Sequence, residues 1–152
     1  MAYCRGMPAL ILAPGAGERH ALGASDVVIK VGAPDTAGGL QLSEFTFPAG
    51  APGPPLHRHE RMHDLVYVLE GTLTVQVEET AHELGPGGLA CVPPGVAHTV
   101  RNASDAPVRL LSLSTPGGFE AYLRDLAEAA ASAGTTREAV EEIAARHDVQ
   151  VV

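Results

Sequence analysis

Short runs of apolar and β-branched residues recur between residues 26 and 114, and Gly, Pro, Asn and Asp separate them. The runs read VVIKVG, GLQLSEFTF, LVYVLEG, TLTVQVEE, GLACVP, HTVRNA and PVRLLSLS. In EFTF and TLTVQV apolar and polar residues alternate with a period of two, which is typical of a strand with one face on a core. Closely spaced short strands with frequent turn residues predict an all-β fold, either a sandwich or a barrel.

The apolar period changes after the sequence TPGG. Apolar residues then recur at intervals of three and four in two segments, Phe119, Tyr122, Leu123 and Leu126 in the first and Val140, Ile143 and Ala144 in the second. This spacing predicts two amphipathic helices, the second capped by Thr135 with Glu138 three residues later. We therefore divide the chain into a β-barrel domain with an N-terminal arm, residues 1–116, and a C-terminal helical extension, residues 117–152. The extension is expected to pack on the outside of the barrel or against a partner subunit.

Length and charge narrow the classes of function. The chain of 152 residues is long enough for one core, and 45% of its residues are hydrophobic, an ordinary globular composition. Its net charge is -8 and its 10 Lys and Arg residues form no cluster, so nucleic acid is not an expected partner. No apolar segment is long enough to cross a bilayer and the N-terminal region lacks a signal-peptide pattern, so we expect no membrane partner and a cytoplasmic location.

The two cysteines lack a metal or redox spacing, and Cys91 is expected to be a small buried residue.

Three histidines and one carboxylate are candidates for a shared site. If the segment LHRH is extended, the rings of His57 and His59 project from the same face of a strand. A turn after them lets the next strand present Asp64 to the same interior. In the later segment GGLACVPPGVAHTVRN, a Pro-x-Gly turn precedes a strand that begins with His98. Imidazole nitrogens with a carboxylate oxygen are a donor set for a divalent transition metal, so these four residues are candidate ligands.

The two histidine segments resemble the two sequence motifs of the cupin superfamily. The residues at the motif positions are His57, His59, Asp64 and Gly71 in the first segment and Gly87, Pro93, Gly95, His98 and Asn102 in the second. The resemblance implies the cupin double-stranded β-helix, a jelly-roll barrel, here with a C-terminal helical tail. It also implies one bound divalent transition metal, drawn from Fe, Mn, Ni, Co, Cu and Zn, with His57, His59, Asp64 and His98 as ligands. Asn102 is expected to tie the strand end by hydrogen bonds rather than to touch substrate.

The acid position departs from the pattern of the family. Cupins usually have Glu there, and Asp64 is shorter by one methylene. Its carboxylate therefore reaches the metal only if the backbone at this position lies further inward, closer to the metal. His63 is the neighbouring alternative, and His63 or water would fill the position if Asp64 fell short. Adjacent residues of a strand face opposite sides, so we expect Asp64 to face the metal and His63 to face outward.

The first motif and the tail that opens TPGGFEAYL resemble bacterial single-domain cupins similar to quercetin 2,3-dioxygenases. That resemblance implies a dioxygenase that uses O2 to cleave a carbon–carbon bond in a small phenolic or enolizable substrate. Asp64 would then be both a metal ligand and the catalytic base that takes a proton from the substrate hydroxyl. Two alternatives stay open: a non-redox metal-dependent isomerase or polyketide cyclase, and a small-molecule-binding cupin without catalysis.

The substrate pocket is expected to be apolar. Its predicted lining is the Val, Leu and Phe residues on the inward faces of LQLSEFTF, LVYVL and LLSLS, although any small barrel fills its core with such residues. The sheet edges and apolar faces that a small barrel leaves open predict a homodimer, since symmetric dimers are the commonest oligomers.

Overall fold

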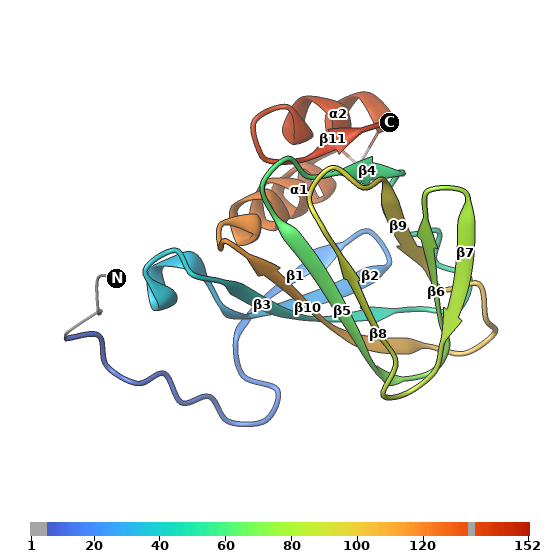
Figure 1. Ribbon diagram of the computed structural model, residues 1–152. Helices are drawn as coiled ribbons and strands as arrows, with labels where there is room; N and C mark the ends of the chain where they lie inside the picture. The colour runs from blue at the N-terminus through green and yellow to red at the C-terminus, as the bar shows by residue number, and fades with distance from the viewer. Residues whose placement is uncertain (1–5, 134–135) are drawn as a thin grey trace.

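The apolar runs form two antiparallel sheets in the computed structural model, which describes residues 6–133 and 136–152. The six-stranded sheet has the order β1 (Glu18–Leu22), β2 (Ser25–Val31), β3 (Gln41–Phe47), β10 (Val108–Thr115), β5 (His63–Glu70) and β8 (Leu89–Val92). The five-stranded sheet has the order β11 (Gln150–Val151), β4 (His57–Arg58), β9 (His98–Arg101), β6 (Leu73–Val77) and β7 (Thr80–Leu84). The sheets face each other across the core (Figure 1), which confirms the predicted double-sheet barrel.

Each apolar run of the sequence lies in or across a strand, whereas the sequence analysis missed β1, β7 and β11. The missed strands β1 and β7 read ERHAL and TAHEL, and each is an edge strand whose residues are largely exposed. An edge strand of this kind buries few side chains and therefore shows no apolar alternation. The missed strand β11 is only two residues long and pairs with β4.

The inner face of the six-stranded sheet is polar at one end and apolar at the other. The buried positions are Gln41, Ser43, Phe45 and Phe47 on β3, Val66 and Val68 on β5, and Val108, Leu110, Ser112 and Ser114 on β10. The predicted apolar lining is therefore wrong for Leu42, Leu111 and Leu113, which are half-buried and alternate with these inward positions. Both faces of these strands carry apolar residues, so a period of two could not tell which face meets the core.

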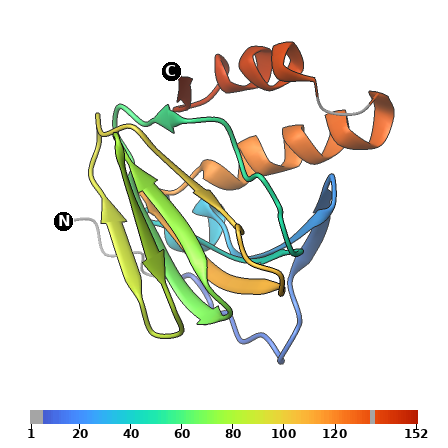
Figure 2. The same cartoon turned by 90° about the vertical axis from the view of Figure 1, so that its right-hand side faces the viewer.

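The C-terminal extension closes one end of the barrel. It contains helices α1 (Phe119–Ala133) and α2 (Arg137–Ala144), as the apolar spacing predicts, and ends in β11. Figures 1 and 2 show that α1, α2 and β11 gather at the end where β4 lies. Its last strand thus joins the five-stranded sheet, which the prediction of a purely helical tail outside the barrel did not foresee.

The side-chain cap at the start of α2 comes from a neighbour of the predicted residue. The cap predicted at Thr135 lies outside the described residues, and the hydroxyl of the neighbouring Thr136 accepts a hydrogen bond from the amide of Ala139 at the start of α2. No helix within residues 6–133 and 136–152 is long and apolar enough to cross a membrane.

Cys91 is exposed, so the expectation of a buried cysteine is wrong. It pairs with Leu65 across β5 and β8, while the next residue, Val92, is 5% exposed and belongs to the core. Neighbouring residues of β8 face opposite sides of the sheet, so Val92 faces the core and Cys91 faces outward. Cys4, the other cysteine, lies outside the described residues.

Candidate metal centre

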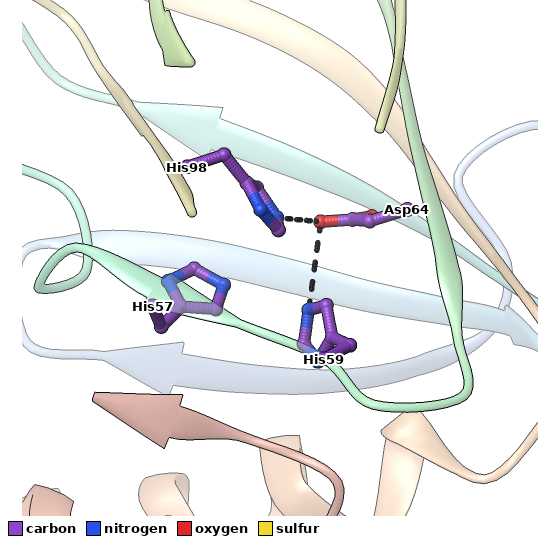
Figure 3. A group of neighbouring side chains, drawn as sticks. All are labelled: His57, His59, Asp64 and His98. Carbon is purple, nitrogen blue, oxygen red and sulfur yellow. Dashed lines mark hydrogen bonds and ion pairs between the residues drawn. The ribbon is translucent and has the colours of Figure 1, made fainter. Parts of the chain in front are cut away.

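Three strands bring the four predicted ligands together inside the barrel. His57 lies on β4 with His59 directly after it, Asp64 lies near the start of β5, and His98 opens β9. His57 and His98 are cross-strand partners of β4 and β9, which sets their rings side by side with centroids 4.6 Å apart. One donor atom from each of the four residues lies within 4.8 Å of the others, and the side chains converge as Figure 3 shows.

Asp64 reaches the cluster despite its short side chain. Its Oδ2 lies 3.1 Å from Nε2 of His98 and 4.0 Å from Nε2 of His59. Its side chain is 16% exposed. The adjacent His63 is exposed and is not part of the cluster, as the alternation of a strand requires. The structure therefore places the carboxylate, and not the fourth imidazole, beside the three histidines.

Backbone carbonyl groups orient all three imidazole rings. Nδ1 of His57 bonds the carbonyl oxygen of Pro55 at 2.8 Å, and Nδ1 of His98 bonds that of Val96 at 3.0 Å. Nδ1 of His59 bonds the carbonyl oxygen of Asp148. Because a carbonyl oxygen only accepts, each Nδ1 is the protonated nitrogen, and each Nε2 is left to act as the ligand.

Two buried atoms at the centre of the cluster have no hydrogen-bond partner among the described residues. They are Nε2 of His59 and Oδ1 of Asp64, and His59 is 2% exposed. A buried polar atom without a partner costs roughly 1–3 kcal/mol, so such atoms need an explanation. A divalent cation bound by Nε2 and carboxylate oxygen atoms satisfies both, and the donor set fits a transition metal.

The surroundings of the cluster shift the pKa values of two of its histidines in opposite directions. Burial, together with the nearby His98, lowers the pKa of His57 to about 4, so its Nε2 lone pair is free at neutral pH. Burial also acts to lower the pKa of His98, but the hydrogen bond to Asp64, the hydrogen bond to the carbonyl group of Val96 and the charge of Asp64 together raise it above its usual value. A cation bound at this site would therefore compete with a proton that His98 holds more tightly than an ordinary histidine does.

Apart from the candidate ligand His98, the second motif contributes residues that hold the site in place. Gly95 has a φ of 85°, which favours glycine, and its amide donates to the carbonyl oxygen of His59 at 2.7 Å. Asn102 is 1% exposed, and its amide nitrogen donates to the carbonyl oxygens of Pro48 and Ala106 at 2.8 and 2.7 Å. The expected role of Asn102 at the strand end is confirmed.

Asp148 is a neighbour of the site that the sequence analysis missed. Its carboxylate accepts hydrogen bonds from the amides of Glu60, Arg61 and Met62 at 2.8, 3.0 and 3.1 Å. Burial acts to raise the pKa of Asp148, but these three amides outweigh it and lower the pKa below its usual range. It stands 89 positions after His59, and no local pattern marks it.

An apolar cavity of about 600 Å³ opens onto the cluster. His57, Asp64 and His98 line one part of it, and aromatic and aliphatic residues line the rest: Phe45, Phe47, Phe119, Tyr122, Leu126 and Val140 among them. Burial raises the pKa of Tyr122 to about 12, so its hydroxyl stays protonated over the physiological range. The site can therefore enclose a small, largely apolar molecule whose polar end meets the four ligands.

Comparison with known proteins shows what the barrel region is similar to. Residues 43–114 match the family model described as a cupin domain. A germin-like protein of Arabidopsis thaliana, subfamily 2 member 1, is 34% identical over 79 residues, which cover 49% of this chain and 36% of that protein. The chain thus spans little more than a third of the length of this curated relative.

Solved structures share the fold at low sequence identity. KdgF from a Halomonas species superposes with a TM-score of 0.66 at 20% identity, covering 75% of this chain and 99% of that chain. A sugar phosphate isomerase of the cupin superfamily from Silicibacter pomeroyi gives a TM-score of 0.52 at 25% identity, covering 60% of this chain and 59% of that one. The barrel and its double-stranded β-helix topology are therefore common to these proteins.

Proposed function

Residues 43–114 match the cupin-domain family model, and we propose that the chain is a metal-dependent dioxygenase acting on a small phenolic or enolizable substrate. The observation that carries the proposal is the apolar, partly aromatic cavity lined in one part by His57, Asp64 and His98, which belong to the cluster of four candidate ligands. Phe45, Phe119 and Tyr122 offer faces against which a planar ring can pack.

The residues of the site have separate tasks in this reaction. A divalent metal bound there would polarise a substrate oxygen and, if redox-active, would support the reaction with O2. His57, His59 and His98 hold that cation through Nε2. Asp64 accepts the proton of the substrate hydroxyl, since its carboxylate lines the cavity beside His57 and His98. The apolar walls keep bulk water away while a carbon–carbon bond breaks and both atoms of O2 enter the products.

A non-redox isomerase is the second candidate. The similarity to a sugar phosphate isomerase of the cupin superfamily at 25% identity favours it, and the same four ligands could serve. Asp64 would then move a proton between neighbouring carbon atoms, and zinc would suffice because no electron is transferred. A polyketide cyclase would use the site in the same way. The complete set of ligands weighs against a binding protein without chemistry.

The test is to purify the protein without chelators, determine its metal content and measure O2 consumption with a panel of flavonols and other polyphenols. We expect a redox-active metal and uptake of O2 with at least one phenolic substrate. Turnover of an enolizable substrate with zinc bound and no O2 consumed would overturn the dioxygenase and support the isomerase or cyclase.

We also propose that the protein forms a homodimer through its exposed apolar surface. Tyr67 and Leu89 pair across β5 and β8 on the outer face of the sheet and are 43% and 56% exposed. The N-terminal arm extends from the barrel (Figure 1) and carries Ile11, which is 86% exposed. A second copy would cover both features. Light scattering should give a dimeric mass, and a monomeric mass at high micromolar concentration would overturn the proposal.

A further inference from the structure

The three histidines of the metal centre do not owe their orientation to the same part of the chain. His57 and His98 each bond a carbonyl group two residues before themselves, so local backbone orients these two rings. His59 instead bonds the carbonyl oxygen of Asp148, and its ring meets the ring of Phe119 edge to face at 5.8 Å. Both partners of His59 belong to the C-terminal extension.

Asp148 also fixes the turn that connects two ligands. Its carboxylate accepts hydrogen bonds from three successive amides, those of Glu60, Arg61 and Met62, which lie between His59 and Asp64. One residue therefore orients a ligand ring through its main chain and holds the adjoining turn through its side chain. Without the carboxylate these three amides lose their acceptor, and the carbonyl group loses its anchor.

The strand that carries the first two ligands depends on the same segment. β4 is two residues long and lies between β9 and β11, so the C-terminal strand completes its pairing. Gln150 pairs with Arg58 and its side-chain oxygen accepts from Nε of Arg58 at 3.0 Å. The extension is held in turn by an apolar cluster of its own, formed by Tyr122, Ile143, Ala144 and Val149.

We propose that Asp148 is a positioning residue of the metal centre, and that docking of the C-terminal segment and metal binding stabilise each other. This inference rests on the proposed metal site and goes beyond it, because it assigns a role to a residue that touches neither the metal nor the substrate. Partners that orient a ligating histidine typically contribute 10- to 100-fold to metal affinity, about the same as two to three hydrogen bonds. Because binding energies couple in both directions, the metal must also stabilise the docked segment.

The first test measures Co²⁺ binding and the visible spectrum of the Co²⁺ form in the wild-type protein, Asp148→Ala and Asp125→Asn. Asp125 is the matched control, since its carboxylate bonds His147 and Arg146 within the extension and none of the turn amides. We expect Asp148→Ala to bind Co²⁺ roughly 10- to 100-fold more weakly and with an altered spectrum, because His59 changes its angle. Asp125→Asn should resemble the wild type in both.

The outcomes separate this inference from the function on which it rests. If the wild type binds no Co²⁺, the metal centre itself is wrong. If the wild type binds it and Asp148→Ala matches it in affinity and spectrum, the positioning role is wrong while the metal centre stands. Equal weakening in Asp125→Asn would assign the effect to loosening of the whole extension and overturn the specific role of Asp148.

A second measurement needs no variant and covers the case in which Asp148→Ala does not fold. Hydrogen exchange of the wild-type amides of Glu60, Arg61 and Met62 should slow when Co²⁺ binds, since these amides bond the docked segment. The amide of Gly50, which bonds the carbonyl oxygen of Ser104, is the internal reference and should change little. Unchanged exchange of the three turn amides in the metal-bound protein would contradict the coupling.

Discussion

The two ends of the barrel interior are built from the same three strands, yet one end is polar and the other apolar. Across β5, β10 and β3 the paired inward residues are Asp64, Ser114 and Gln41 in one layer and Val66, Ser112 and Ser43 in the next. Further along they are Val68, Leu110 and Phe45. The metal centre lies at the polar end.

This difference shows how the fold separates chemistry from stability. Buried apolar side chains stabilise a fold in proportion to the surface they remove from water, and Val68, Leu110 and Leu73 are at most 1% exposed. Buried polar groups stabilise it only when they are paired. At the polar end, Nε2 of His59 and Oδ1 of Asp64 have no hydrogen-bond partner among the described residues. The stabilisation from the apolar end thus offsets the cost of burying unpaired polar groups at the polar end.

The largest effect is expected from removing the base at the polar end. Asp64→Asn keeps the shape of the side chain but removes its capacity to accept a proton, so turnover should fall by roughly 10²- to 10⁴-fold. The fold should persist, and much of the bound metal with it. Steady-state rates and metal analysis on the same preparation measure both.

His63→Ala is the matched control for Asp64, because the adjacent side chain is exposed on the opposite face. It should retain metal and most of the turnover. Loss of metal in His63→Ala, with metal retained in Asp64→Ala, would show that the imidazole rather than the carboxylate is the ligand.

The next effect is expected at the apolar end. Leu110→Ala should lower the free energy of unfolding by about 2–5 kcal/mol, because a leucine 1% exposed leaves a cavity when truncated. The folded fraction should still bind metal. Leu113→Ala on the outer face of the same strand, where the side chain is half-buried, should cost less in chemical denaturation. Equal losses for the two leucines would contradict the assignment of inward faces.

A smaller effect is expected from pH. The pKa of His98 is raised by Asp64, so the protonated form persists at higher pH than for an ordinary histidine, and this proton competes with the metal. Metal affinity should therefore fall as the pH drops through that raised pKa, by about tenfold per pH unit for one displaced proton. His57, with a pKa of about 4, should add to the fall only near that pH. Zn²⁺ titrations between neutral and mildly acidic pH measure the slope, and a flat profile would contradict the assignment.

The ligands could be predicted from sequence because their spacing is local. His57 and His59 share a strand face, Asp64 follows His59 by five residues, and His98 comes after a turn that Pro93 and Gly95 mark. Most strands of the barrel could be predicted for the same reason, since their apolar alternation reflects burial on one face.

What could not be predicted depends on contacts between distant residues. The inward positions Ser112 and Ser114 and the outward Leu111 and Leu113 differ only in register, which the pairing with β5 and β3 decides. Asp148 contacts His59 through its main-chain carbonyl, and its carboxylate accepts hydrogen bonds from three amides of the turn. Neither interaction requires a sequence pattern near the motifs. The same holds for β11, whose two residues gain their strand character only by pairing with β4.

The proposed function and the role of Asp148 both depend on His57, His59, Asp64 and His98 forming one metal site. The most direct test is elemental analysis of the wild type and of the His57→Ala, His59→Ala double variant, both purified without chelators and checked for folding by circular dichroism. We expect about one divalent metal ion per wild-type chain and almost none in the folded double variant. Equal metal content in the two proteins would contradict it.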